Sequence, residues 1–371
     1  MAQLQPGVQT QTTVLKPGAA CNPNSANYLS ACTGGANAAN GLTTTYSLAP
    51  NLRSSYTMQA AIGVDQQLGK IGSISVNYLP SRGNHEFFTR VTANGNQLNY
   101  QYQSEGVFRE QQLFVNASVR TKTLTGFGYY ALNLAKTNAG SAGFIPTSTN
   151  PSVDYGRAAF ANTHFAVMGA NYTAPWKIAL SPFVIMHSGN PYNITTGTDN
   201  NGDSVYNDRP SFANGLSAVC TDKTTFNGST GTASEIPINY CTGPAAITVN
   251  LRAARTFGFG PKLAVAGAAG GGGRGGPGGG PRGGPGGGGG GRGPGGPGGP
   301  PGGGGGSTGR KYNMTLGVQA QNLFNDVNYA APTATSALTS TQFGRQTQLA
   351  GRPFGTPNAV RVLQLQATFN F

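Results

Sequence analysis

The C-terminal stretch of the chain alternates strictly between apolar and polar residues. From Leu363 to Phe371 the odd positions are apolar, and the even positions carry uncharged polar side chains. Successive side chains of a β-strand point to opposite faces of the sheet. This stretch is therefore predicted to be a strand with one apolar and one polar face, and its apolar face ends in aromatic residues.

Eight further segments repeat this alternation, and their lengths suit strands that cross a membrane at a tilt. They are Tyr56–Leu68, Ser73–Pro80, Val107–Arg120, Gly126–Lys136, His164–Ala174, Trp176–Ser188, Ala246–Phe259 and Arg310–Phe324. With the C-terminal strand, the sequence predicts about nine strands.

The composition narrows the fold class. Charged residues make up 9% of the chain and hydrophobic residues 37%, whereas soluble domains average about 25% and about 45–50%. No apolar run reaches the roughly 18 residues of a transmembrane helix. A membrane β-barrel is consistent both with this composition and with the lack of a long apolar run, because one face of each strand meets lipid and the other a polar lumen. We therefore expect an antiparallel transmembrane β-barrel, present in part; the alternative is a soluble all-β protein with long loops.

The predicted connections alternate in length, with short turns at 69–72, 121–125 and 174–176 and long polar loops at 81–106, 138–162, 189–245 and 325–358. Outer-membrane barrels keep short turns in the periplasm and long loops outside. This pattern predicts a periplasmic C-terminus and extracellular long loops. Residues 1–55 are then a further outer loop or the start of a fragment, and 56–371 form the barrel part.

A glycine-rich insert at 266–309 interrupts the barrel part. Its centre, 270–306, contains only Gly, Pro and Arg, so it has little to bury and is predicted to be disordered, as a solvated tether. Arg-Gly-Gly units also occur in RNA-binding tails, and the net charge is +13. The basic residues are scattered and no aromatic residues interleave the insert, so nucleic acid is not expected as a partner.

The four cysteines form two local couples, Cys21 with Cys32 and Cys220 with Cys241, each in a polar stretch between predicted strands. An even number of cysteines in loops favours two disulfides and an oxidising compartment over metal binding, because no histidine lies near either couple.

Residues 1–10 lack the basic start and apolar core of an export signal. Since a barrel must be exported, we expect the chain to be a fragment of a longer precursor.

A polar loop holds the best candidate for a binding site. Asp199, Asn201 and Asp203 have the 1, 3, 5 spacing of a calcium loop, and Asn207 and Asp208 offer further oxygens. Ser204 and Pro210 replace the Gly and Glu of an EF-hand, which excludes that motif. The residues are expected either to bind calcium loosely or to order the loop as Asx turns under Arg209. The expected partner of Asp208 is Arg209 or an arginine of the lumen. We find no catalytic constellation and no other cofactor-binding motif, and the chain is not expected to be an enzyme.

Three blocks of sequence, in this order, resemble the C-terminal half of the barrel of TonB-dependent receptors of the Oar-like type. They are 51–59 with 67–68, 75–78 and 81–83; 188–194 with 199–210; and Gln321-Asn322-Leu323-Phe324-Asn325-Asp326-Val327-Asn328-Tyr329 with Phe343-Gly344, Arg352 and Phe371.

The resemblance implies a 22-stranded barrel with an N-terminal plug, which imports a scarce substrate with energy delivered by TonB. The plug is not in this chain, so TonB would act through it only in a longer protein. Implied partners are outer-membrane lipid, an unidentified substrate and the barrel-assembly machinery, whose signal Phe369 and Phe371 resemble. An alternative function is a surface-exposed structural or adhesion β-protein with a glycine-rich tether.

Overall fold

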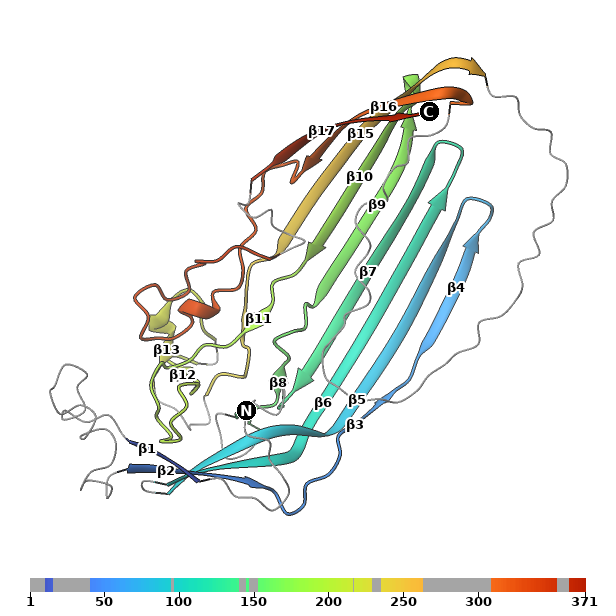
Figure 1. Ribbon diagram of the computed structural model, residues 1–371. Helices are drawn as coiled ribbons and strands as arrows, with labels where there is room; N and C mark the ends of the chain where they lie inside the picture. Colours follow the sequence, from blue (N-terminus) through green and yellow to red (C-terminus); the bar gives the residue numbers. More distant parts are fainter. Residues whose placement is uncertain are drawn as a thin grey trace.

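The computed structural model describes residues 11–15, 41–94, 97–139, 145–146, 153–215, 217–228, 235–262, 308–351 and 360–371. These residues form one large sheet with loops at one end and short turns at the other (Figure 1). The predicted all-β, antiparallel architecture is confirmed. Within these ranges, none of the helical segments has the length and apolar character that a membrane-crossing helix needs.

The main sheet has nine strand positions in the described residues. In order across the sheet they are β3 (Tyr56–Gln59) and β4 (Ile62–Leu68), which share one position, then β5 (Gly72–Asn94), β6 (Gln97–Arg120), β7 (Leu124–Thr137), β9 (His164–Ala174), β10 (Ile178–His187), β15 (Ala246–Lys262), β16 (Arg310–Gln321) and β17 (Val362–Asn370). All neighbours along this order pair antiparallel. Among the described residues β4 pairs only with β5 and β17 only with β16, so the sheet is open at both sides.

The register collects the apolar residues of successive strands on one face, called here the apolar face. One row of directly paired residues runs across seven strands: Val64, Val76, Val115, Tyr130, Ala166, Met186 and Ile247. A second row, Leu251, Ala320 and Leu363, continues toward β17. Because strand side chains alternate with a period of two, a slip of one residue would move a whole strand's apolar set to the other face.

The opposite face is largely polar and neutral. Hydroxyl and amide side chains bond across and along its strands, as in Ser73–Ser118 at 2.8 Å and Thr256–Thr315 at 2.9 Å. A small apolar cluster of Val167, Phe183 and Ile185 interrupts it on β9 and β10. Charged residues of this face bond to neutral amides, as Glu110 does to Gln112 at 2.9 Å and Arg252 to Gln366 at 3.3 Å.

The prediction of a long polar loop at 81–106 is wrong. Both β5 and β6 continue through this region as a ribbon, and only residues 95–96 lie outside the described residues. Phe88 and Leu98 are buried in it, with 0% and 2% exposure, and supply the apolar packing that an irregular loop would lack. The sequence did contain a hairpin signal, Asn94-Gly95, between alternating residues.

The ribbon carries further strands where an outer loop was predicted at 1–55. Strand β2 (Gly41–Leu48) pairs in parallel with residues 97–102 of β6, and β1 (Gln11–Leu15) pairs with β2. Figure 1 shows this ribbon at the same end of the sheet as the long loops. The glycine-rich insert lies outside the described residues, except for its last two positions, 308–309.

Candidate functional site in the loop cap

The long loops at one end of the sheet fold together into a compact unit. We call this unit the loop cap; it comprises the described residues of 153–163, 188–245 and 322–351. Its short elements are β8 (Gly156–Arg157), β11 (Pro191–Tyr192), β12 (Ser211–Phe212), η3 (Lys223–Thr225), β13 (Phe226–Asn227), β14 (Cys241–Thr242) and η4 (Thr333–Thr335). Two small ribbons, β11 with β14 and β12 with β13, join segments far apart in the loop 188–245.

An apolar core holds the loop cap together. Ile194 and Ile236 are fully buried at its centre, and Tyr192, Phe226 and Phe343 pack around them. Full burial of such a side chain stabilises a fold by about 1.5–3 kcal/mol. Phe343 comes from the loop between β16 and β17, so the core joins two loops that are separate in sequence. Two of the predicted long polar loops, 189–245 and 325–358, therefore share an apolar core in their described residues.

Cys220 and Cys241 form a disulfide at the edge of this core. The bond closes a loop with a sequence separation of 21 residues, and its Cα atoms lie 5.8 Å apart. A crosslink over a loop of this length contributes about 3 kcal/mol by restricting the unfolded chain. Cys21 and Cys32, the other predicted disulfide couple, lie outside the described residues.

Arg209 is the buried charged centre of the loop cap. Its guanidinium contacts Asp154 at 2.6 Å and Glu235 at 2.8 Å, and the Arg209 and Asp154 side chains have no exposed surface. The three residues come from three separate loop segments, so one cation fixes the positions of all three. Removal of one partner from such a buried pair costs about 3–5 kcal/mol, because a charge stays buried without its partner.

Asp208 is not in direct contact with Arg209, one of its two expected partners; the ion pairs of Arg209 are with Asp154 and Glu235, and its charge only lowers the pKa of Asp208 against the effect of burial. Asp208 instead accepts a hydrogen bond from the backbone N–H of Asn200 at 2.7 Å. Neighbours in sequence point to opposite sides of an extended backbone, which explains why adjacent charges do not pair. Asp154 and Glu235 lie 55 and 26 positions from Arg209, and no local pattern marks them as its partners.

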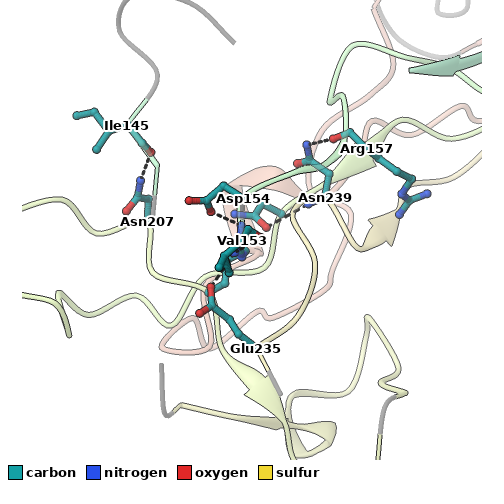
Figure 2. A network of polar contacts seen from close by, with 9 residues as sticks. Ile145, Val153, Asp154, Arg157, Asn207, Glu235 and Asn239 are labelled. Atoms are coloured by element: carbon teal, nitrogen blue, oxygen red, sulfur yellow. Dashed lines mark hydrogen bonds and ion pairs between the residues drawn. The ribbon is translucent and has the colours of Figure 1, made fainter. Parts of the chain in front are cut away.

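A second clamp joins β8 to β14. The Arg157 guanidinium donates to the hydroxyl of Thr242 at 2.8 Å, to the carbonyl of Cys241 at 3.0 Å and to the carbonyl of Tyr240. In return, the Asn239 side chain donates to the Arg157 carbonyl at 2.6 Å (Figure 2). Burial lowers the pKa of the Arg157 guanidinium, and its carbonyl partners show that it acts as a hydrogen-bond donor to the disulfide-bearing strand.

The loop 199–208 is ordered by its own carboxylates. Asp199 accepts hydrogen bonds from the backbone N–H groups of Gly202 at 2.8 Å, Asp203 at 3.1 Å and Ser204 at 2.9 Å. Asp203 accepts from Val205 at 2.8 Å and from the Asn201 amide at 3.1 Å. These are Asx-type turns, in which a carboxylate replaces the backbone acceptor.

The remaining predicted residue of this loop, Asn207, points elsewhere. Its side-chain amide donates to the carbonyl of Ile145 at 2.8 Å and ties the loop to another segment (Figure 2). Among the residues that the structure describes, no group of three or more His, Cys, Asp or Glu side chains is placed to hold a metal ion. The observed contacts are those of the loop-ordering alternative.

The acidic loop also affects neighbouring titratable groups. Burial raises the pKa of the Asp203 carboxyl, and the negative charges of Asp199 and Asp208 add to the rise, against hydrogen bonds that lower it. Burial likewise raises the pKa of Asp208. The pKa of Tyr100, on the β5–β6 ribbon, is raised by burial, then by Tyr46, Asp203 and Asp199. The ribbon and the acidic loop therefore lie within electrostatic reach of each other.

Two asparagines join the loop between β16 and β17 to the main sheet. Asn328 accepts a hydrogen bond from the Ile247 N–H at 2.9 Å and donates to the Ile247 carbonyl at 2.9 Å. Asn322, in a left-handed conformation with φ 53°, accepts from the Asp326 N–H at 3.0 Å and donates to its carbonyl at 2.9 Å. The block 321–329 thus consists of a tight turn followed by a side chain that pairs with the backbone of β15.

The predicted C-terminal signal residues lie at the opposite end of the sheet. Phe369 packs between Tyr312 and Phe371, with ring centroids 6.1 and 6.2 Å away, and Phe371 is 92% exposed. The loop cap and these aromatic residues are therefore separate features.

No model of a protein family matches the sequence, and no curated protein matches it. Several solved structures have a similar backbone path. They include the outer membrane transporter YddB from Escherichia coli (10% identity, TM-score 0.38, 86% of this chain and 32% of the other), the FrpB iron transporter from Neisseria meningitidis (12%, 0.40, 88% and 32%) and BauA, the ferric preacinetobactin receptor from Acinetobacter baumannii (11%, 0.41, 85% and 29%). The chain spans about a third of the length of these structures.

Proposed function

We propose that this chain is the C-terminal part of the barrel of an outer-membrane TonB-dependent receptor, of the Oar-like type suggested by its sequence blocks. The observation that carries the proposal is the continuous apolar face of the main sheet. Its side chains are exposed, for example Val64 at 66%, Ile62 at 70% and Leu365 at 85%. An apolar surface extending over nine strand positions is far larger than soluble monomers expose, and lipid is the environment that would cover it.

The open sides of the sheet support a role as part of a larger barrel. The unpaired N–H and C=O groups of β4 and β17 cannot remain exposed in lipid, where no water is present to bond them. We propose that further strands of a longer receptor complete the barrel on both sides. Uptake, the plug and contact with TonB then belong to that longer protein.

In the proposed orientation the loop cap is extracellular, and the short turns and Phe371 are periplasmic. Barrels of this kind place long loops outside, and a disulfide needs the oxidising conditions found there. The loop cap and the β5–β6 ribbon would contact the transported substrate by binding alone, without covalent chemistry. The barrel-assembly machinery would recognise the strand that ends in Phe369 and Phe371.

Calcium binding in the loop 199–208 stays a prediction. If calcium binds, addition of Ca²⁺ should raise the midpoint of unfolding of the loop cap, and Asp199→Asn should abolish that rise. Because Asp199 also accepts three backbone hydrogen bonds, the variant must be compared with the wild type in chelator. An equal midpoint with Ca²⁺ and with chelator would leave only the loop-ordering role.

Membrane extraction tests the proposed function. The protein should fractionate with outer membranes, require detergent for extraction and migrate faster on gels before heating than after it, as folded barrels do. Protease added outside intact cells should cut the loop cap only after the disulfide is reduced. Full solubility without detergent would refute the membrane role and favour the alternative of a surface-exposed structural β-protein.

A further inference from the structure

A groove crosses the apolar face next to the short turns. Its volume is about 490 Å³, and it is lined by residues of β4, β5, β6, β7, β9 and β10. Gly126 and Gly128 form its floor, with Leu68 and Val119 toward the turns and Met168 and Val184 toward the middle of the sheet. From Leu124 to Gly128 the floor runs for about 13 Å, at about 3.3 Å per residue.

The backbone conformation does not require glycine at the two positions of this floor. Neither Gly126 nor Gly128 has a positive φ, so an ordinary residue could adopt either conformation. A Cβ atom at Gly128 would meet only the Cγ atom of Met168, at 3.8 Å, which is an ordinary contact. At Gly126 it would lie 3.2 Å from Val119 Cγ1, so the open space is at Gly128. The neighbouring Ala117 and Ala170 are also small. Space for an apolar ligand, rather than turn geometry, therefore distinguishes this part of the face.

Four cations lie in or next to the short turns, beyond the residues that line the groove. Lys70, Arg120, Lys122 and Lys177 are all exposed. The three turns lie side by side, because the Arg120 N–H bonds to the Ile71 carbonyl and the Thr173 N–H to the Thr123 carbonyl, each at 2.7 Å. None of the 11 acidic residues lies in these turns. These three turns therefore carry a net positive charge.

The turn between β9 and β10 places an aromatic residue beside these cations. Its residues form η2 (Pro175–Lys177), where Trp176 and Lys177 have φ angles of 60° and 59°. A left-handed conformation costs a non-glycine residue about 1–2 kcal/mol, so glycine would suit both positions better. The sequence instead places the 78% exposed Trp176 next to a lysine. Tryptophan prefers the level of lipid headgroups.

We propose that this groove and its four cations bind one anionic phospholipid, with an acyl chain over Gly126 and Gly128 and the phosphate among the turn cations. The inference rests on the proposed membrane location and adds a ligand to it. The occupant is a lipid rather than a second protein because the groove belongs to the face that lipid covers. The occupant is anionic because, in the described part of the chain, the turn cations form no ion pair with an acidic residue, and each adds to the attraction of a negative headgroup.

Native mass spectrometry tests this site on protein extracted from cell membranes in mild detergent. Phosphatidylglycerol and zwitterionic phosphatidylcholine of the same acyl chains serve as probes. The wild type should retain one phosphatidylglycerol with an affinity on the order of tenfold above that for phosphatidylcholine. A variant with Lys70, Arg120, Lys122 and Lys177 all changed to Gln should lose this preference.

Each variant of the proposed site has a matched control elsewhere in the protein, which separates a loss of lipid binding at the groove from a general effect of added bulk or lost charge. Gly128→Leu fills the floor and should lower phosphatidylglycerol retention, whereas Ala166→Leu adds bulk to the same face of β9, outside the groove lining, and should not. Lys223→Gln, in the loop cap, should leave the preference unchanged. Equal retention of both lipids by the wild type, or a dimer that excludes lipid, would overturn the inference while the protein remains a membrane protein. Absence of the protein from the membrane fraction would overturn the proposed function as well.

Discussion

At the scale of single residues, a buried ion network determines how the segments of the loop cap are arranged. The chain has few charged residues, yet the side chains of Arg209 and Asp154 have no exposed surface, and that of Glu235 is only 8% exposed. A buried ion network contributes little net stability compared with apolar packing, but loss of one member is costly. Its role in the loop cap is to fix three loop segments in one arrangement.

We expect Arg209→Met to open the loop cap, because the guanidinium that two buried carboxylates contact is lost. The loss should be about 3–5 kcal/mol of local stability. Hydrogen exchange at the Ile236 and Thr196 amides, which bond to Pro210 and Asp208, would report it as a fall in protection on the order of 10²–10⁴-fold. Arg345→Met, at an exposed position of the loop cap, is the control. Unchanged protection in Arg209→Met would show that apolar packing alone holds the segments.

The raised pKa values of Asp203 and Asp208 predict that their effect on the stability of the loop cap is opposite in sign to that of most aspartates, whose lowered pKa values make acid destabilising. Because burial raises both pKa values, the folded loop cap binds protons more tightly than the unfolded chain does. Their contribution is unfavourable at neutral pH and is relieved as pH falls from the raised values toward the ordinary Asp pKa of about 3.9. Asp222 acts oppositely: hydrogen bonds from Thr224 lower its pKa, so its stabilisation is lost only at still lower pH.

Carboxyl NMR titration should therefore give midpoints above the ordinary value for Asp203 and Asp208 and below it for Asp222. In Asp203→Asn, the gain in loop-cap stability on acidification should shrink. A wild-type loop cap that loses stability steadily from pH 7 to pH 4 would contradict this assignment.

At the scale of elements, side chains replace backbone pairing where strands meet loops. Asn328 is only 5% exposed, and its amide bonds both backbone groups of Ile247, as a neighbouring strand would. The β5–β6 ribbon shows the complementary case, in which strand pairing continues into a region that its polar composition marks as loop.

Asn328→Ala should detach the loop 322–351 from the start of β15. The Ile247 N–H loses its acceptor, at a cost of about 1–3 kcal/mol for a buried donor. Faster hydrogen exchange at Ile247, with little change at Ala320 in the same sheet, is the expected readout. Gln348→Ala provides the control, because Gln348 contacts Ala330 through its backbone carbonyl. Equal rates of hydrogen exchange at the Ile247 amide in both variants would contradict a pairing role for Asn328.

At the scale of the whole molecule, charge and apolar surface are distributed along the strand axis. Ten of the 11 acidic residues, all except Asp65, belong to the loop cap, the ribbon or the adjoining strand ends, and none lies in the short turns. The cationic turns, the apolar groove and the aromatic C-terminus lie at the other end. This polarity gives the two ends of the sheet different surroundings, which matches the proposed orientation across a membrane.

Deletion of Phe369–Phe371 should block assembly of the longer receptor in the outer membrane, because the proposed recognition strand would lose its aromatic end. The measurement is the amount of heat-modifiable protein in the outer-membrane fraction. Leu365→Ala, on the same face of β17 and similarly exposed, should assemble as the wild type does. Normal insertion of the deletion variant would refute a signal role for these residues.

The sequence by itself determined the strands of the main sheet and which of their faces is apolar. Alternation with a period of two is a local pattern. It can be read within a single segment, such as Leu363–Phe371 or Tyr56–Leu68, whichever strands pair with it. The sequence also paired Cys220 with Cys241, which form a disulfide, and left the loop 199–208 open between a loose calcium site and a set of Asx turns.

Only the tertiary structure decided how the loops fold. The contacts of Arg209 with Asp154 and Glu235, the joint core of Ile194 and Phe343, and the groove over Gly126 and Gly128 each combine segments distant in sequence. Such contacts depend on packing and burial, which no periodic pattern encodes. The polar composition of 81–106 misled the prediction for the same reason, since pairing with β2 and burial of Phe88 outweigh local propensity there.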